Sequence, residues 1–492
     1  MKAKTRLMKI GCMLLAVLLL VPAFAACGNG GNDGGTVTTA AQSSDGTAPV
    51  PHYDWGGRPF QVLCTHNEHE PNFEVVGNSS GDIVEQSAFS RNNWIEDYYN
   101  VEILDVGKET DDQNKLIQTA IASGDSPYDL VFLQRSNMSS AIVNGYMKDL
   151  NQLLYLDFTH DWYNDYTVAS MEVGDRLFHL ASSFSLVDKA RTNVLFFNRD
   201  LASEYYQGKD DVIQLVRDGD WTVEKMLEYA KGYDIDGVDG MSLSDRWGVV
   251  LGGNEAPSVF WTGLGNKTIS FDEDGNWSVN LASDRSILSV DKLKLLFNAD
   301  SSFTGNHFGT YDDPYDTFIS NRAFFFGSSL SGIKSVSENA PFAYSVIPYP
   351  KFDADQQEYY TTNDNVYCST FGVPQCAADA NFSGFMIEVL SWRSHTTTYP
   401  AFTETVCKVR GSYDAVCYEM LELTLKGLTF DFGLMYSIGT KPGPRTILVN
   451  SIMQPETAIS TEYKKVQEAM EGTSDSPGKL PNLLTVIANL DD

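Results

Sequence analysis

The stretch VEILDVGKETDDQNKLIQTAIASGDSPYDLVFL, residues Val101–Leu133, decides the fold. Its apolar start at Val101–Val106 predicts a strand, and Asp112–Ser123 then carries apolar residues at helical spacing. Gly124 stands where such a helix needs a left-handed C-cap, and the apolar run Leu130–Leu133 predicts a short strand that is buried on both faces. The stretch is therefore expected to form a strand–helix–strand unit.

The residues before this stretch repeat the pattern. Arg58–Cys64 predicts a strand, and Ile83–Tyr98 carries apolar residues at the spacing of a helix. Strand, helix, strand, helix, strand is typical of a parallel sheet with crossover helices. Ligands of such sheets bind outside the carboxyl ends of the strands. The loops Thr65–Glu70 and Gln134–Asn137 are therefore the first candidate functional loops.

The alternation of strands and helices continues toward the C-terminus. A helix is predicted after Thr222, which is its expected N-cap, and another at Ser283–Phe297. The Gly327-Ser328-Ser329 run predicts a loop, and the pattern after residue 380 is mostly helical. Residues 57–492 are too many for one hydrophobic core, so two lobes are expected. Further strands are predicted at Leu177–Ala181, Val194–Phe197, Trp247–Leu251, Ala323–Phe326 and Tyr344–Ile347.

The N-terminus predicts export from the cell. Basic residues precede the apolar run Gly11–Phe24, which is too short to span a membrane comfortably, and small residues then lead to Cys27. Residues 1–26 are expected to be a cleaved signal peptide. The junction resembles a bacterial lipobox, although Phe24 replaces the usual leucine, and this resemblance implies that Cys27 is lipidated. A plain signal peptide or an uncleaved anchor are the alternatives. Residues 27–56 lack large apolar runs and are expected to be a flexible linker.

Charge and cysteine content narrow the function classes. The net charge of −30 argues against nucleic acid and anionic headgroups as partners, because both need clustered Lys and Arg. No CxxC or Cys/His zinc spacing is present in the sequence. Five cysteines remain after Cys12 and Cys27, and buried free thiols are the favoured interpretation. The alternatives are a Cys368–Cys376 or a Cys407–Cys417 disulfide, and Cys64 is the fifth cysteine.

Three pairs of segments carry a family resemblance by their order and spacing. They are Leu116–Val131 with Gly145–Asn151, Val194–Leu201 with Asp220–Thr222, and Asn321–Phe326 with Ile347–Lys351. The chain resembles an extracellular solute-binding protein of bacterial ABC transporters, of the sugar-binding, maltose-binding-protein-like cluster. The resemblance implies an α/β, periplasmic-binding-protein-like fold of type II, in which two lobes close on ligand about a hinge. By analogy, lobe one takes residues 57–183 plus 368–425, and lobe two takes 184–367 plus 426–492.

The resemblance also implies where a ligand binds. The family's loop after the third strand corresponds to Gln134, Arg135 and Ser136, and Arg135 suits hydrogen bonds to hydroxyls or a carboxylate. An aromatic platform in lobe two corresponds to Trp261, whose neighbouring glycines favour a loop position, although a Trp in the core is the alternative. Further candidates for ligand contact are Ser328, Ser329 and Trp162.

Two polar clusters could act in binding or coordinate a metal. His66 and Asn67, in His66–Glu70, follow the first strand, where a hydrogen-bonding loop is favoured over a metal site. Asp234, Asp236 and Asp245 have part of the spacing of a calcium loop, but Val238 and Asp239 depart from it. No cofactor is therefore expected, and a structural Ca²⁺ ion is the alternative to a solvated acidic turn.

These observations predict a receptor rather than an enzyme. We expect a monomeric, lipid-anchored protein on the extracellular face of the cell membrane, which captures a small solute, expected to be a carbohydrate, for ABC permease subunits. The sequence has no Gly-x-Ser-x-Gly elbow, HExxH motif or phosphate loop. A secreted glycoside hydrolase needs only two carboxylates, which composition cannot exclude, and is the main alternative. An orphan lipoprotein that acts as a sensor or an adhesin is the other alternative.

Overall fold

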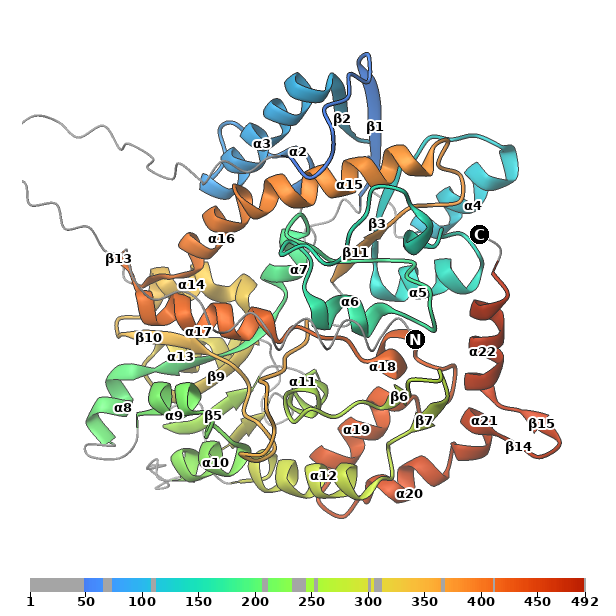
Figure 1. Ribbon diagram of the computed structural model, residues 1–492. Coiled ribbons are helices and arrows are strands. Elements are labelled where there is room, and N and C mark those ends of the chain that lie inside the picture. The colour runs from blue at the N-terminus through green and yellow to red at the C-terminus, as the bar shows by residue number, and fades with distance from the viewer. Residues whose placement is uncertain are drawn as a thin grey trace, which may run out of the picture. The chain divides into compact units, whose positions relative to one another are not determined.

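The computed structural model describes residues 48–490, apart from 65–72, 108–111, 206–210, 232–244, 252–254, 300–301, 305–311, 364–367 and 410–411. Two sheets, each with its own helices, organise this part of the chain (Figure 1). The first sheet has the strand order β11-β3-β1-β2 and the second β10-β4-β9-β5-β8. Their strands are β1 (Arg58–Leu63), β2 (Val101–Asp105), β3 (Leu130–Gln134), β4 (Asn193–Asn198), β5 (Trp247–Leu251), β8 (Ser302–Thr304), β9 (Ala323–Ser329), β10 (Tyr344–Ile347) and β11 (Ser369–Gly372).

The first sheet confirms the predicted parallel arrangement. β1 pairs in parallel with β2 and with β3, and β11 joins β3 in the antiparallel direction. The long helix before β2, α3 (Ile83–Tyr99), begins with a capping box in which Asp82 and Glu85 bind each other's backbone amides. α4 (Gln113–Ser123) ends at Gly124, whose φ of 74° is the left-handed conformation expected of it. The five predicted elements of residues 58–134 are therefore all present.

The second sheet differs from the prediction at the end of β9. Gly327–Ser329 was expected to be a loop, but it continues the strand, because Gly327 pairs with Leu195 and Ser328 with Val194 on antiparallel β4. The all-buried sequence of β4 supplies an apolar partner, so backbone pairing outweighs the low strand preference of Gly and Ser. The predicted strand Leu177–Ala181 is also wrong, since it makes a single bridge, between Leu180 and Phe371.

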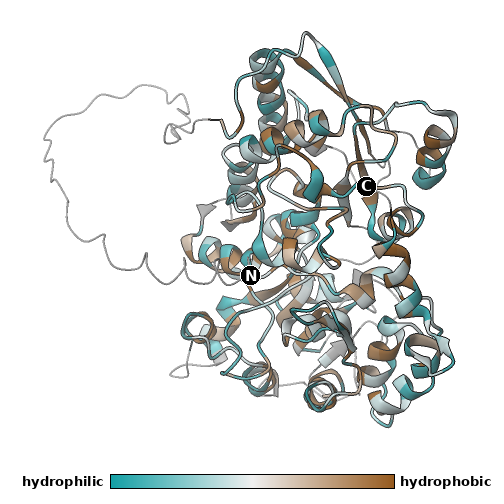
Figure 2. Cartoon of the chain, turned by 45° about the vertical axis from the view of Figure 1, so that its right-hand side comes forward, coloured by the Kyte–Doolittle hydropathy of each residue, from teal (hydrophilic) through white to brown (hydrophobic). Residues whose placement is uncertain are grey.

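Helices surround both sheets, and hydrophobic segments occur in strands and in helices (Figure 2), while β4 and β5 are buried along their whole length. α3 packs against α15 (Ala380–His395) and α16 (Thr398–Val406) near the first sheet. α12 (Asp284–Phe297) contacts α10 (Val223–Lys231), α11 (Ala256–Gly263) and α19 (Pro444–Met453) beside the second. The remaining helices are α2 (Phe73–Val76), α5 (Arg135–Val143), α6 (Asp165–Met171), α7 (Leu186–Ala190), α8 (Arg199–Tyr205), α9 (Val212–Asp218), α13 (Asp312–Ile319), α14 (Ile333–Asn339), α17 (Ala415–Lys426), α18 (Phe432–Tyr436), α20 (Ile459–Lys464), α21 (Gln467–Glu471) and α22 (Lys479–Ala488).

The C-terminal third of the chain contacts elements of both lobes. α17, which the sequence analysis assigned to lobe one, packs against β10 of the second sheet. α19 packs on α11 and α12, whereas α18 and α22 both contact α5, the helix that follows β3. The short hairpins β6 (Ile269–Phe271)–β7 (Trp277–Val279), β12 (Lys408–Val409)–β13 (Ser412–Tyr413) and β14 (Gly472–Thr473)–β15 (Ser476–Pro477), and the 3₁₀ turns η1 (Leu150–Gln152) and η2 (Leu330–Gly332), complete the described elements. The exact lobe boundaries stay a prediction.

Three chain segments cross between the lobes side by side. The Asn193 amide donates to the Thr362 carbonyl (3.0 Å), and Thr192 forms a bridge with Asn363. Thr361 exchanges backbone hydrogen bonds with the third segment, accepting from Thr429 (2.9 Å) and donating to Gly427 (3.0 Å). The three crossings therefore form one hydrogen-bonded hinge.

Within the residues that the structure describes, no helix is both long enough and apolar enough to cross a bilayer.

Candidate functional site

The end of β3 carries three of the predicted ligand residues, and the structure places them in different environments. Helix α5 begins directly at Arg135, where the sequence analysis expected a loop. Gln134 is half-buried, Arg135 is buried and Ser136 is exposed. Ser136, and in part Gln134, therefore face solvent at this sheet edge, whereas the Arg135 side chain enters the hinge.

Arg135 connects the first lobe to the central crossing segment. Its Nη2 atom donates to the Asn363 carbonyl (2.9 Å) and also to Asn363 Oδ1. Its guanidinium lies over the Phe430 ring, 4.8 Å from the centroid. These contacts hold the guanidinium against two of the three crossings, so Arg135 is built to position the hinge.

A buried polar cluster continues from Arg135 across the hinge. Asn363 donates to Asp188 Oδ1 and to Cys368 Sγ (2.8 Å), and Lys189 Nζ lies 3.2 Å from Asp188 Oδ2. All of these side chains are buried. Because buried polar groups are costly unless they are bonded, this network favours one relative arrangement of the crossings.

His179 lies beside this cluster and is held in the neutral form. Its Nδ1 atom is 2.9 Å from Thr370 Oγ1 on β11. Burial, with a smaller contribution from the nearby Arg135 charge, lowers the pKa of His179 to about 3. The imidazole is therefore uncharged at any physiological pH.

Ser328 and Ser329 end β9 and meet the same hinge from the second lobe. Both are half-buried, and Ser329 Oγ is 2.6 Å from Ser331 Oγ. The next residue, Leu330, donates its amide to the Thr192 carbonyl (3.0 Å), and Thr192 is the bridge partner of Asn363. A continuous series of contacts thus joins the end of β9 to the end of β3.

Several predicted residues lie outside the described part of the chain. Residues 65–72, 108–111, 252–254 and 305–311, which come after β1, β2, β5 and β8 in the sequence, lie outside the described residues. His66 and Asn67 fall in the first of these ranges, and Asp234 and Asp236 fall in 232–244. Asp245, the third residue of the predicted calcium loop, is described and is buried just before β5.

Trp261 lies in the core of the second lobe. It sits in helix α11, not in the expected loop, and its side chain is 0% exposed. The helix has Pro257 in its first turn, where a missing amide hydrogen costs nothing. Neighbouring Phe260 packs edge-on against Tyr349 in the same core. No ring face of Trp261 is open to a ligand in this arrangement, which favours the structural interpretation of this residue.

Trp162, the other tryptophan predicted to contact ligand, lines a cavity of about 320 Å³. Its ring is half-buried and lies 4.2 Å, centroid to centroid, from His160, whose Nδ1 atom is 2.7 Å from Glu388 Oε1. Other lining residues are Tyr166, Lys189, His395, Tyr399, Glu422 and Lys426. Aromatic faces beside charged and hydroxyl groups suit a small polar ligand.

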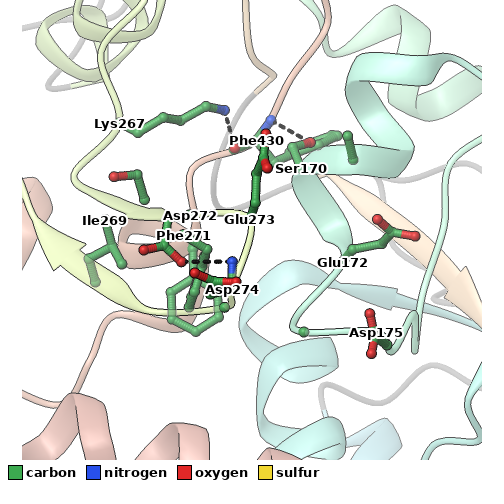
Figure 3. A pocket seen from close by; sticks show the side chains of 15 residues that line it. Ser170, Glu172, Asp175, Lys267, Ile269, Phe271, Asp272, Glu273, Asp274 and Phe430 are labelled. Carbon is green, nitrogen blue, oxygen red and sulfur yellow. Dashed lines mark hydrogen bonds between the residues drawn. The ribbon is translucent and has the colours of Figure 1, made fainter. Parts of the chain in front are cut away.

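A larger cavity of about 460 Å³ lies between α6 with its following loop and the β6–β7 hairpin (Figure 3). Glu172 and Asp175 line one side, and Asp272, Glu273 and Asp274 line the other. Hairpin amides and Asn276 bind the Asp272 carboxylate, and these bonds lower its pKa. The lining is therefore strongly acidic.

Lys267 is the cation of this acidic cavity. Its amine donates to Thr429 Oγ1 (2.8 Å) and to the Phe430 carbonyl (2.5 Å), both on the third crossing segment. Burial lowers the pKa of Lys267 to about 8, and nearby Asp431 opposes that shift. Lys267 thus ties the second lobe to the hinge, as Arg135 ties the first.

A third cavity, of about 260 Å³, connects the other two along α6. It shares Tyr166 with the Trp162 cavity, and it shares Ala169, Ser170 and Lys267 with the acidic cavity. The three cavities therefore follow α6 in sequence order and lie beside the crossing segment that contains Thr429.

The hinge residues Asn363, Asp188 and Lys267 were not among the predicted site residues. Each stands next to a predicted strand or in a polar run without a motif, so no periodicity marks it. Polar residues near a predicted crossing segment are the one signal that could have suggested them.

Comparison with solved structures identifies the fold. No protein-family model and no curated protein sequence matches the chain. A cyclo/maltodextrin-binding protein in complex with maltotetraose is similar, with a TM-score of 0.55 and 13% identity over 91% of this chain and 98% of that one. An ABC substrate-binding protein from Listeria monocytogenes in complex with cycloalternan gives 0.51 and 12% over 84% and 98%. The galacto-N-biose-/lacto-N-biose I-binding protein of an ABC transporter from Bifidobacterium longum gives 0.51 and 13% over 88% and 96%.

The predicted fold is therefore confirmed: the chain has the periplasmic-binding-protein-like α/β fold seen in sugar-binding substrate-binding proteins of ABC transporters.

Proposed function

We propose that this protein captures a carbohydrate outside the cell by closing its two lobes and delivers it to the permease of an ABC importer. The fold supports capture between lobes, because hinge closure around a ligand is the established motion of this architecture. Three of the similar structures are named for, or were solved with, oligosaccharides, which supports a carbohydrate as the ligand class. Lipid anchoring through Cys27 is part of the proposal and is supported by the N-terminal sequence.

One observation carries the proposal: the ends of β3 in the first lobe and β9 in the second meet at a single bonded hinge. Arg135, at the end of β3, binds Asn363, which bridges Thr192, and Thr192 accepts from Leu330 at the end of β9. A ligand held between these ends would contact both lobes. It would bind the closed form more tightly than the open form, which is the condition for closure on binding.

The described side chains at this edge suit a sugar. Gln134 and Ser136 on the first lobe, and Ser328 and Ser329 on the second, offer an amide and hydroxyls near the hinge. Such planar and hydroxyl groups make the directional hydrogen bonds that a hydroxyl-rich ligand needs. Arg135 acts in this proposal as a positioning residue, because its guanidinium is engaged with the crossing segments.

A melting-temperature screen tests the proposal. The purified protein is titrated with maltotetraose, lacto-N-biose and cycloalternan as probes, and at least one is expected to raise the melting temperature. A probe at 100 times its dissociation constant stabilises the native state by about 2.7 kcal/mol. The same samples are analysed for shorter sugars, since their release would support the glycoside hydrolase instead.

The Ser136→Tyr variant tests whether the ligand binds at the end of β3. The bulky ring should remove the sugar-induced shift, because Ser136 is exposed at the end of β3. Ser90→Tyr is the matched control, since Ser90 is also an exposed helix serine but lies on α3. Equal shifts for both variants would place the ligand elsewhere.

Membrane fractionation tests the anchor. Cys27→Ser is expected to move the protein from the membrane fraction to the medium, because a thioether-linked lipid cannot form on serine. A variant that remains entirely in the membrane fraction would favour an uncleaved anchor.

A further inference from the structure

Two cysteines that are separate in sequence meet at the base of a hairpin. Cys407 follows α16, and Cys417 lies in the first turn of α17. The intervening strands β12 and β13 pair Lys408 with Tyr413, so the residue before β12 faces the residue after β13. Asp414 fixes this closure, because its amide donates to the Cys407 carbonyl (2.9 Å) and its carboxylate accepts from the Cys417 amide (2.9 Å).

The two thiols are in contact inside a buried cluster that they share with Val194, Phe196 and Trp247 of the second sheet. Both side chains are 0% exposed. The Cys407 thiol donates a hydrogen bond to the Cys417 sulfur, and this contact raises the pKa of Cys407 and lowers that of Cys417. The Val346 amide and the Ser345 hydroxyl of β10 also stabilise the Cys417 sulfur. The sulfur of Cys417 is thus held in place from three sides.

The other cysteines have different surroundings. Cys368 Sγ lies 2.8 Å from Asn363 Nδ2 and 3.3 Å from Asp188 Oδ1, within the hinge cluster. Cys376 lies near Tyr128 and Lys148. Cys64 is buried in the first lobe's core. Of the two disulfides that the sequence left open, the structure therefore supports the Cys407–Cys417 pair.

We propose that Cys407 and Cys417 form a disulfide bond in the protein outside the cytoplasm. Disulfides persist in such oxidising compartments, so the proposal rests on the export that the proposed function requires. The oxidant is a disulfide-bearing thiol oxidoreductase or a small-molecule disulfide. Its S–S bond takes up two electrons and two protons and becomes two thiols, while two S–H bonds of the chain are replaced by one S–S bond.

The bond would join two helices that already touch. α16, just before Cys407, packs on α3 and also contacts α17, and α17 packs on β10 of the second sheet. A cross-link here closes the loop 408–416 in the unfolded chain and so reduces the entropy that folding must overcome. It would also fix the start of α17 against the end of α16.

Peptide mapping tests the proposal directly. The full-length protein is expressed with export, quenched in acid, and alkylated in denaturant without reduction, so that burial protects no thiol. Trypsin cleaves after Lys408 and Arg410, which places Cys407 in peptide 394–408 and Cys417 in peptide 411–426. The two peptides are expected to appear linked and to separate on reduction. Cys368 and Cys376 share one tryptic peptide and serve as the internal control, expected to carry alkyl groups before reduction.

The control variant is Cys417→Ser, in which Cys407 should become alkylated in the unreduced sample. Alkylation of Cys407 and Cys417 in the unreduced exported protein would overturn the proposal, as would a linked pair that involves Cys368 or Cys376. The sugar melting shift is measured on the same sample. Free thiols together with a normal shift would refute the disulfide and leave the proposed function standing.

Discussion

At the scale of single residues, burial divides the aromatic candidates into two kinds. Trp261 has no exposed surface and lies in helix α11, in the core of the second lobe, whereas Trp162 is half-buried on the wall of a cavity. An aromatic ring contributes to ligand affinity only when one of its faces is open. The two tryptophans should therefore respond in opposite ways to the same substitution.

Trp261→Ala is expected to lower the free energy of unfolding by about 3–5 kcal/mol, because it empties a large buried volume. Trp162→Ala should cost much less. Urea unfolding of both variants measures this difference, and sugar titration at low temperature measures affinity. A Trp261→Ala protein that unfolds like the wild type but loses sugar binding would restore Trp261 as a ligand platform.

The lowered pKa of buried His179 predicts that the protein loses stability in acid. Its pKa is about 3 in the folded protein against an ordinary 6.5. Between these values the unfolded chain binds more protons than the native state, so the free energy of unfolding falls as the pH is lowered from about 6.5. The contribution of this one group approaches about 1.4 kcal/mol per pH unit.

Urea midpoints of the wild type and His179→Asn between pH 7 and pH 4.5 measure this effect, since other titrating groups are common to both. Asn keeps a polar partner for Thr370 but takes up no proton. The stability difference between the two proteins should change steadily below about pH 6.5. Parallel curves over the whole range would mean that His179 titrates normally.

At the scale of elements, the sequence predicted the helices and strands that have a regular apolar spacing or a clear cap residue. The apolar spacing of Ile83–Tyr98 predicted α3 to within one residue of its end at Tyr99, and the Gly124 cap ends α4 as expected. α11 was missed because all eight of its residues are buried, so it lacks the polar face that marks a surface helix. The end of β9 was missed because its Gly–Ser composition reflects a close approach to Leu251 and Tyr349, which sequence alone does not show.

For the candidate site, the sequence predicted the position of the residues along the chain but not the direction of their side chains. The position of Gln134, Arg135 and Ser136 at a strand end follows from the order of strands and helices. That Arg135 turns into the hinge depends on Asn363, a residue more than 200 positions away in the chain. Such a partner is set by tertiary packing and leaves no local pattern.

Gly427, in the third crossing segment, lies too close to the backbone of Tyr359 for any larger residue. A Cβ atom at this position would lie 1.9 Å from the Tyr359 carbonyl oxygen, which is backbone and cannot rotate away. Gly427→Ala should therefore force the crossings apart and cost about 1–3 kcal/mol or more. Gly332→Ala is the control, because its Cβ would meet nothing closer than Ser328 Oγ at 3.9 Å. Equal urea midpoints for the two variants would contradict this description of the hinge.

At the scale of the whole molecule, three bonded crossings join the two lobes, and the proposed closure would move one lobe toward the other about them. Small-angle X-ray scattering should show a smaller radius of gyration when a stabilising sugar is added, because closure brings the two lobes together. Ser136→Tyr should keep the larger value at the same sugar concentration, and Ser90→Tyr should behave like the wild type. An unchanged radius on sugar binding would indicate a receptor that is rigid on this scale.

The pairing of β11 with β3 has a consequence for biogenesis. The first sheet receives its last strand from Ser369–Gly372, long after β1, β2 and β3 have been synthesised. The N-terminal half therefore cannot complete its own core while the rest of the chain is still emerging, and contacts of such long sequence separation form slowly. On the proposed export route, the chain would therefore reach the secretory channel before its first lobe has folded, in the extended form that such a channel transports.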